Sequence, residues 1–277
     1  MNRILTIQDI SCIGKCSLTV ALPIISSFGI ETAVLPTAVL SNHTAFKDFT
    51  FRDLTEDLEN ITNLWQKENV QFKSIYTGYL GSIKQIDIVS NIFDRFNSGN
   101  TLLIVDPAMA DNGKLYTGFD TDFVKKMASL CSKADIIVPN LTEACMMIGL
   151  PYVKEHYTED YVKEILIKLT DLGCKIAVLT GISFDNDKLG AYAYNSQTKE
   201  FFSYYNTRLP ITFHGTGDIF ASTLCGALNK NFSLEKSLKI AVDFTLKSIL
   251  CTVENPNHNW YGVDFERALP YLTEIIK

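Results

Sequence analysis

Residues 74–106 have the sequence SIYTGYLGSIKQIDIVSNIFDRFNSGNTLLIVD, which begins and ends with a short apolar run. The runs Ser74–Gly78 and Leu102–Asp106 are rich in aliphatic and β-branched residues and have the length of buried strands. The longer segment between them predicts an amphipathic helix over residues 84–97. The stretch therefore predicts one strand–helix–strand unit, from which parallel sheets are built.

The same alternation extends over most of the chain. Further strands are predicted at Ile4–Gln8, Ala33–Leu40, Asp135–Val138 and Ile176–Thr180, and a hairpin at Leu189–Asn195 and Phe201–Tyr205. Further helices are predicted near 16–28, 53–68, 120–132, 140–148, 158–172, 217–229, 234–253 and 264–276. We therefore expect an α/β fold, with a doubly wound, mostly parallel central sheet and helices on both faces, in a single domain over residues 1–277.

The composition limits the class of function. The chain has 277 residues, and the 47% that are hydrophobic suffice for a substantial core. Its 25 Lys and Arg against 31 Asp and Glu give a net charge of −6. Because non-specific nucleic-acid binding usually needs a basic surface, we expect no nucleic-acid partner.

The cysteines and the N-terminus indicate the compartment. The 7 cysteines are odd in number, and several lie in apolar runs where a free thiol packs as a small hydrophobe. Cys12 and Cys16 have no further cysteine pair or His-x₃₋₅-His segment with which to complete a zinc site. The first apolar stretch is too short for a signal peptide, and no run approaches the ~20 apolar residues of a membrane span. We expect reduced cysteines and a cytoplasmic protein without a membrane partner.

Polar or glycine-rich groups follow each predicted strand of the parallel sheet. They are Asp9, Ser41–Thr44, Gly78–Gly81, Asp106, Asn140 with Glu143, and Thr180 with Gly181. In open parallel α/β sheets, ligands bind outside the carboxyl ends of the strands. Each group alone is compatible with an ordinary polar loop, but their coincidence at one edge predicts a ligand site.

The strongest single motif is His214–Ala221, with the sequence HGTGDIFA. Its Gly-x-Gly loop precedes a helix on which Phe220, Leu224 and Leu228 recur every four residues. Exposed N–H groups of such a loop and the positive end of the helix dipole together favour an anion. Asp218 is placed to accept a proton from a hydroxyl group that attacks phosphorus, although a first-turn aspartate is also simply favourable for a helix.

Two other segments have structural interpretations. Gly14-Lys15-Cys16-Ser17 matches the end of a P-loop, but the earlier glycine of that motif would fall on Asp9, so the P-loop hypothesis is rejected. Asn140-Leu141-Thr142-Glu143 is typical of a helix capping box, which leaves a second role for Glu143 open.

Together these motifs resemble the ribokinase superfamily, and specifically its pyridoxal/pyridoxamine kinase branch, over nearly the whole chain. Three segments resemble motifs of the superfamily: Gly215–Asp218 (anion hole and catalytic aspartate), Asp106–Met109 (nucleotide and metal side) and Pro139–Glu143 (metal-water motif). Three further segments resemble the substrate side of the vitamin B6 kinases: Ser41–Thr44, Gly78–Ser82 and Ile7–Asp9. Asp9 departs from the branch, where serine is common, so the preferred B6 vitamer stays open.

The resemblance implies a ribokinase-like kinase that phosphorylates the 5′-hydroxymethyl group of pyridoxal, pyridoxamine or pyridoxine, as in vitamin B6 salvage. It implies that Asp218 and the amides of Gly215, Thr216 and Gly217 are catalytic, and that Asp9, His43, Thr44 and Tyr79 contact the vitamer. It implies ATP placement by Asp106, Asn140, Thr180 and Thr216, and Mg²⁺ binding by Asp106 and Glu143.

The resemblance also implies a homodimer, and it leaves dependence on a monovalent cation such as K⁺ open. Residues 111–116 resemble a flap over the nucleotide, although Asp-Asn-Gly is also strong turn chemistry.

Three alternative functions are kept. A hydroxymethylpyrimidine kinase of thiamine synthesis shares the fold and a nitrogen-ring substrate, but we expect it to have other substrate-side residues. A sugar or nucleoside kinase is disfavoured because no inserted lid is evident before Ser41. A non-catalytic B6-binding protein is disfavoured by the presence of Asp218, Asp106 and Glu143.

Overall fold

The computed structural model describes residues 3–277, which fall into two compact units. Unit 1 comprises residues 3–81 together with Leu209–Lys277, and unit 2 comprises Ser82–Arg208. Each unit contains parallel strands extended by antiparallel ones, with helices packed against them. This confirms the predicted α/β class with mostly parallel strands and flanking helices.

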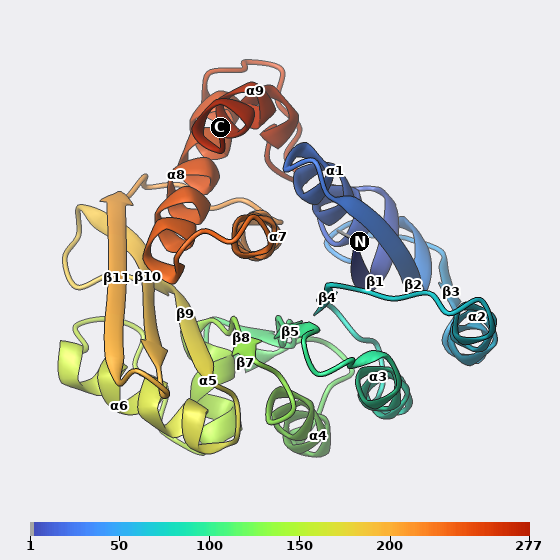
Figure 1. Cartoon of the computed structure of the whole chain (residues 1–277). Helices are drawn as coiled ribbons and strands as arrows, with labels where there is room; N and C mark the ends of the chain where they lie inside the picture. Colours follow the sequence, from blue (N-terminus) through green and yellow to red (C-terminus); the bar gives the residue numbers. More distant parts are fainter. Residues whose placement is uncertain (1–2) are drawn as a thin grey trace. The chain divides into compact units, whose positions relative to one another are not determined.

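Strand β1 (Arg3–Ile13) is central in unit 1, where the strand order is β4-β1-β2-β3. It pairs in parallel with β2 (Glu31–Asn42) and β4 (Ser74–Thr77), whereas the short β3 (Phe51–Asp53) is antiparallel to β2. The helices are α1 (Leu18–Ser27), α2 (Thr55–Lys67), α7 (Thr216–Asn229), α8 (Leu234–Val253) and α9 (Phe265–Ile275). Figure 1 shows α1 alongside β1 and β2, and α7 packs against both α1 and α8.

Strand β1 is longer than predicted, which changes the position of Asp9. Its pairing with β2 shifts register between Gln8 and Ile10, and the strand then continues to Ile13. A bulge of this kind redirects side chains without ending the strand. The prediction that Asp9 follows the first strand is therefore wrong: Asp9 lies at an irregularity inside β1.

In unit 2 the strand order is β11-β10-β9-β8-β5. Strands β5 (Leu102–Val105), β8 (Ile136–Ile137) and β9 (Ile176–Ile182) are parallel, and β10 (Lys188–Asn195) and β11 (Glu200–Thr207) form the predicted antiparallel hairpin. Figure 1 shows this hairpin beside β9. The helices are α3 (Ile83–Phe96), α4 (Thr121–Cys131), α5 (Leu141–Ile148) and α6 (Glu159–Asp171).

A small second hairpin occupies the segment that resembles a flap. Strands β6 (Ala110–Asp111) and β7 (Lys114–Leu115) are joined by Asn112 and Gly113, which have φ values of 50° and 78°. Asparagine and glycine tolerate this left-handed conformation better than other residues. The Asp-Asn-Gly sequence, which is typical of turns, therefore forms a turn in the structure.

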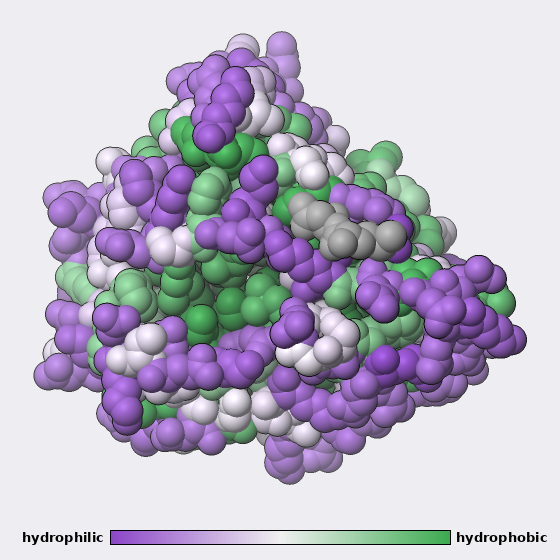
Figure 2. Space-filling view, viewed as in Figure 1, coloured by the Kyte–Doolittle hydropathy of each residue, from purple (hydrophilic) through white to green (hydrophobic). Residues whose placement is uncertain are grey.

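Helix α2 illustrates how burial follows from helical spacing. Thr55, Leu58 and Thr62 are buried at intervals of three or four residues, while Glu56 and Asp57 are exposed. The buried side packs against β2, and Figure 2 shows a largely hydrophilic surface over the rest of the helix.

No helix between residues 3 and 277 is long and apolar enough to cross a membrane. All seven cysteines lie within this range, and all seven are free.

Candidate active site

The predicted site residues fall into two groups, one in each unit. Unit 1 holds the vitamer-side and catalytic residues, which are Asp9, His43, Thr44, Tyr79, Gly215, Thr216, Gly217 and Asp218. Unit 2 holds the nucleotide- and metal-side residues, which are Asp106, Asn140, Glu143 and Thr180.

The predicted anion loop ends at Gly215, the residue before helix α7. Gly215 has φ 81°, and a Cβ atom at this position would overlap the carbonyl oxygen of Lys15. Both facts require glycine. No side chain among the described residues caps this helix start, so its first N–H groups keep their capacity to bind an anion.

Asp218 lies in the first turn of α7, and its carboxyl group has a shifted pKa. Burial raises the pKa of Asp218 to about 7, the backbone N–H of Ser17 opposes this rise, and the negative charge of Asp9 adds to it. A carboxylate with a pKa near neutrality suits a general base better than an ordinary aspartate does.

Asp9 is buried among polar groups of unit 1. Its side chain is 5% exposed, and Ser11 Oγ donates a hydrogen bond of 3.1 Å to Asp9 Oδ2. Burial raises the pKa of Asp9, while the hydroxyl groups of Ser17 and Ser11 lower it. The charge of Asp9 also raises the pKa of His43 and of Tyr79.

His43 has both ring nitrogens engaged within unit 1. The Ala45 N–H donates to Nδ1 at 3.1 Å, so Nε2 carries the proton and donates to the Tyr261 carbonyl at 2.9 Å. Burial lowers the pKa of His43, which favours the neutral ring. His43 therefore offers a ligand its ring surface, among the aromatic rings of Phe46 and Trp260, rather than a free nitrogen. Its neighbour Thr44 is exposed.

The predicted capping box at the start of α5 is confirmed. Asn140 Oδ1 accepts the Glu143 N–H at 3.0 Å, and Glu143 Oε2 accepts the Asn140 N–H at 2.9 Å. The remaining Asn140 amide group donates to the Ala110 carbonyl at 2.7 Å. The Asn140 side chain therefore serves the local structure, although the residue also borders the pocket described below.

Glu143 joins α5 to the segment after β5. Its Oε1 accepts the N–H groups of Met109 at 2.9 Å and Ala110 at 3.3 Å. The side chain is 2% exposed, and burial raises the pKa of Glu143 to about 7 against the effect of these backbone donors. Both carboxylate oxygens are thus occupied by backbone donors.

The carboxylates expected to order Mg²⁺ do not form a preassembled cage. Asp106 directly follows β5, and its Oδ1 accepts the Ala108 N–H at 3.2 Å. Nowhere in residues 3–277 do three or more His, Cys, Asp or Glu gather as they would around a metal ion. Kinase Mg²⁺ sites need only one or two protein carboxylates, because substrate phosphates and water supply the other ligands. Asp106 fits such a site, and Glu143 fits it only through water.

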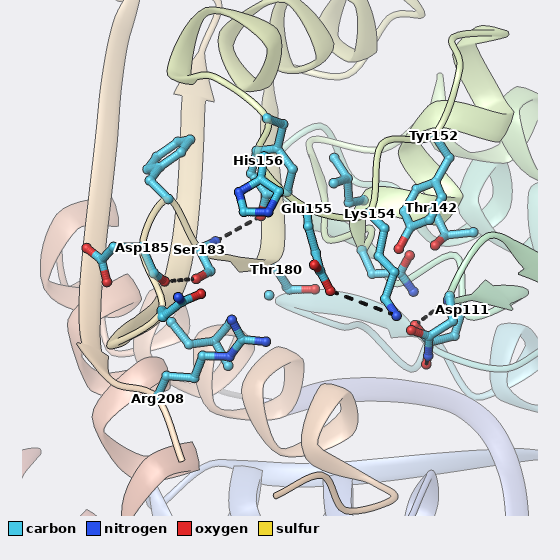
Figure 3. Close-up of a pocket in the computed structure, with 18 residues that line it drawn as sticks. Asp111, Thr142, Tyr152, Lys154, Glu155, His156, Thr180, Ser183, Asp185 and Arg208 are labelled. Atoms are coloured by element: carbon cyan, nitrogen blue, oxygen red, sulfur yellow. Dashed lines mark hydrogen bonds and ion pairs between the residues drawn. The ribbon is translucent and has the colours of Figure 1, made fainter. Parts of the chain in front are cut away.

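Unit 2 contains a pocket of about 350 Å³, which is within the range of small-molecule sites. Asn140 and Thr180, predicted to place ATP, line it, whereas Asp106 and Glu143 do not. Figure 3 shows Lys154, Thr180 and Arg208 around this pocket. The flap segment borders it through Asp111 and Asn112, and the Gly113 N–H donates to Thr142 Oγ1 at 3.0 Å.

Several residues that lie close to the predicted site residues were not themselves predicted from the sequence. Lys154 and Tyr157 lie in the loop before α6, and Tyr157 OH accepts the Ser183 N–H at 2.9 Å. Arg208 directly follows β11. Ser17, whose backbone N–H lowers the pKa of Asp218, belongs to the segment rejected as a P-loop.

Known proteins resemble this chain in sequence and fold. The family model described as phosphomethylpyrimidine kinase matches residues 31–262. A crystal structure from Bacteroides thetaiotaomicron, described as a phosphomethylpyrimidine kinase in a crystal form with pyridoxal, is 41% identical, with a TM-score of 0.93 over 98% of this chain and 95% of that one. Pyridoxal kinase from Lactobacillus plantarum is 28% identical, with a TM-score of 0.90 over 99% and 98% of the two chains. Pyridoxal kinase from Arabidopsis thaliana is 27% identical over 90% of this chain and 81% of that one. These matches confirm the predicted resemblance, and the chain belongs to the phosphomethylpyrimidine kinase family as a relative of the pyridoxal kinases of the ribokinase superfamily.

Proposed function

We propose that this protein is a vitamin B6 kinase, which transfers the γ-phosphoryl group of ATP to the 5′-hydroxymethyl group of pyridoxal, pyridoxamine or pyridoxine. The observation that carries the proposal lies in unit 1. There an uncapped helix start with a glycine loop holds Asp218, whose pKa is raised to about 7, and Asp218 has Asp9 as a neighbour. An anion site next to a base and a polar, partly aromatic cluster suits phosphorylation of a hydroxylated nitrogen ring.

The reaction assigns a distinct task to each part of this cluster. The hydroxyl oxygen of the vitamer attacks the γ-phosphorus, a new O–P bond forms, and the bond to the bridging oxygen breaks so that ADP leaves. The hydroxyl proton passes to the Asp218 carboxylate, which acts as general base. The N–H groups of Gly215, Thr216 and Gly217 stabilise the negative charge on the transferring group.

The pocket of unit 2 suits the nucleotide. Lys154 and Arg208 bring positive charge to it, and Asn140 and Thr180 line it. Lys154 pairs with Glu155 at 4.0 Å, but both side chains are largely exposed, so this pair competes little with a phosphate. Mg²⁺, when bound with ATP, neutralises phosphate charge, and Asp106 is the carboxylate that would hold it, with Glu143 acting through water.

The main alternative is a hydroxymethylpyrimidine kinase, since the family model is described as a phosphomethylpyrimidine kinase, which also acts on a pyrimidine. One experiment separates the hypotheses: ADP release from ATP is measured with pyridoxal, pyridoxamine, pyridoxine and hydroxymethylpyrimidine side by side. We expect the three B6 vitamers to be turned over with higher kcat/KM than the pyrimidine. Preference for the pyrimidine would overturn the proposal, and vitamer binding without ADP release would indicate a binding protein.

We also propose that the active form is a cytoplasmic homodimer, as the resemblance implies. Light scattering with the purified full chain tests the assembly, and a mass of one chain would contradict it. Fractionation of the source cells tests the compartment.

A further inference from the structure

The loop that joins α8 to α9, residues 254–264, lies next to the residues that start α7. The ring of His258 in this loop packs edge-on against that of Phe213, with centroids 5.9 Å apart. At the end of the loop, Asp264 Oδ1 lies 2.9 Å from Lys15 Nζ. The Lys15 carbonyl oxygen in turn faces the glycine before α7 so closely that no Cβ atom fits between them. The α8–α9 loop is therefore held beside the predicted anion loop, within unit 1.

Trp260 in this loop belongs to an aromatic cluster around His43. The centroid of the His43 ring lies 5.1 Å from that of Phe46 and 6.0 Å from that of Trp260. The centroids of Phe46 and Trp260 are 4.7 Å apart. The His43 ring also lies 5.4 Å from that of His214, the residue directly before Gly215. The aromatic cluster thus reaches from Trp260 to the anion loop.

The backbone beside Trp260 is bonded to the same histidine. The Tyr261 carbonyl accepts the proton of His43 Nε2 at 2.9 Å, and the Tyr261 ring lies 5.4 Å from that of Phe46. His43 is buried, and a Cβ atom at Gly14 would come within 2.7 Å of its ring. These contacts fix the position of Trp260 relative to His43, which is one of the predicted vitamer contacts.

Trp260 keeps an open surface in spite of these contacts, because it is 57% exposed. The rings of His43, Phe46 and Tyr261 meet its ring at interplanar angles of 71°, 50° and 83°, so these contacts are edge-on or tilted and not stacked. Single exposed apolar residues are common, but an exposed ring that continues an aromatic cluster beside an anion loop indicates a ligand site. A flat aromatic ligand gains most from such a ring, through offset stacking.

We infer that Trp260 is a substrate-binding residue, which stacks on the pyridine ring of the B6 vitamer and makes the α8–α9 loop one wall of the vitamer site. The inference rests on the proposed kinase function and adds a residue to it. The reacting hydroxymethyl group has to reach the anion loop, so the ring that carries this group lies within reach of an aromatic cluster that includes His214.

This role predicts a distinct pattern of selectivity. Stacking depends on the π face of a ring and tolerates different substituents. Trp260 should therefore contribute equally to the binding of pyridoxal, pyridoxamine and pyridoxine. Asp9, by contrast, is expected to distinguish the amine from the aldehyde.

The first test compares Trp260→Leu with Trp260→Phe. Leucine is apolar but has no aromatic face, whereas phenylalanine keeps one. We expect Trp260→Leu to raise KM for all three vitamers by the same factor of about five to ten, the usual size of an aromatic contact. Because the contact is present in the ground state and the transition state alike, kcat should stay within about threefold and KM for ATP within about twofold. Trp260→Phe should bring the vitamer KM back to within about threefold of wild type.

Trp65→Leu is the matched control, because Trp65 is the other of the 2 tryptophans in the chain. It lies on α2, where its ring packs against that of Phe72 with centroids 5.8 Å apart. Its substitution should leave KM for every vitamer within about twofold of wild type. Thermal unfolding checks that each variant is folded at the assay temperature.

A second measurement keeps Trp260 in place. In Trp65→Phe, Trp260 is the remaining tryptophan, so the fluorescence reports on its exposure alone. We expect saturating pyridoxine, without ATP, to lower the bimolecular quenching constant of acrylamide at least about twofold, because a stacked ring covers one face of the indole. Fluorescence lifetimes enter this constant, which separates shielding from energy transfer to the vitamer.

Failure of this inference and failure of the proposed function give different results. Wild-type enzyme that releases no ADP with any of the three vitamers contradicts the proposed function. Active wild-type enzyme overturns the role of Trp260 if the vitamer KM stays within about twofold in Trp260→Leu, or if pyridoxine leaves the quenching constant unchanged. A changed mass of Trp260→Leu in light scattering, at constant KM, would also overturn it and assign the ring to a contact between two copies of the chain. Equal rises in KM that phenylalanine reverses support it.

Discussion

At the scale of single residues, two carboxylates in unit 1 differ in their surroundings and therefore in their chemistry. Asp218 lies in the first turn of α7, and the backbone N–H of Ser17 lowers its pKa, whereas the hydroxyl groups of Ser17 and Ser11 lower the pKa of Asp9. The charge of Asp9 helps to raise the pKa of Asp218 to about 7. Paired acids of this kind commonly take separate roles, and the roles that we propose are the base for Asp218 and a vitamer contact for Asp9.

Removing the charge of the base gives the first prediction. Asp218→Asn should lower kcat by about 10²–10⁴, the usual contribution of general acid–base catalysis, while ATP still binds. Coupled assays of ADP release give kcat, and calorimetry gives the Kd for ATP. Asp122→Asn is the matched control, because Asp122 also lies in the first turn of a helix, α4, but is exposed. Asp218→Asn with more than about a third of wild-type kcat would remove Asp218 from this role.

A second prediction concerns the effect of Asp9 on the selectivity of the enzyme between pyridoxamine and pyridoxal. Its buried carboxylate can accept a charge-assisted hydrogen bond from the ammonium group of pyridoxamine, and such a bond is worth about 1.5–3 kcal/mol. Pyridoxal has no ammonium group and cannot form this bond. Asp9→Ser should therefore lower the pyridoxamine/pyridoxal ratio of kcat/KM at least about tenfold. Loss of both activities at a constant ratio would mean that Asp9 faces the ring nitrogen instead, and unchanged activities would place the vitamer elsewhere.

At the scale of elements, the two groups of residues lie at two helix starts, one without a side-chain cap and one with a full capping box. Helix α7 begins after Gly215 without a side-chain cap, which leaves N–H groups for an anion. Helix α5 begins with the full capping box of Asn140 and Glu143, and Glu143 also accepts two N–H groups of the segment after β5. The first start is suited to a ligand, and the second holds neighbouring backbone in place.

The third prediction follows from this use of Glu143. Glutamine has one acceptor oxygen, so Glu143→Gln turns an NH₂ group toward a backbone N–H and should lower the free energy of unfolding by about 1–3 kcal/mol. Urea unfolding measures this loss, and Glu235→Gln, at an exposed first-turn position of α8, is the control. A stable Glu143→Gln variant would contradict the importance of these bonds. A raised Mg²⁺ requirement in the same variant would support the water-mediated metal role.

At the scale of the whole molecule, burial of ionisable groups makes stability depend on pH. Asp218 has a folded pKa of about 7 against 3.8 for an ordinary aspartate, and burial is the largest cause. Between these values the folded protein binds more protons than the unfolded chain, so the stability contributed by this group falls as pH rises.

The fourth prediction tests that linkage. Asp218→Asn removes the cost of ionising a buried carboxylate, so its stability relative to wild type should grow by about 1–3 kcal/mol between pH 5 and pH 8, since one pKa unit corresponds to about 1.4 kcal/mol. Thermal or urea unfolding across this range measures the difference. A difference that stays constant with pH would show that Asp218 titrates normally.

Features that arise from neighbours along the chain follow from the sequence alone. Apolar periodicity predicted the helices and most strands, the Gly-x-Gly loop predicted the start of α7, and the Asn140–Glu143 spacing predicted the capping box, because these interactions span three or four residues. The short β3, β6 and β7 were missed, since two or three residues carry no periodicity.

Interactions between residues that are far apart in the sequence are decided by the tertiary structure. Lys15 is paired with Asp264 across 249 positions, and His43 with the Tyr261 carbonyl across 218, so neither partner follows from local spacing. The bulge at Asp9 depends on how β1 pairs with β2. The polar residues around Asp9 led to the prediction of a strand end, because polar residues that are buried cannot be distinguished by sequence from those of a loop. The cause is general: local preferences come from backbone and side-chain geometry over a few residues, whereas the burial, charge and hydrogen bonding of a site are set by which segments the fold brings together.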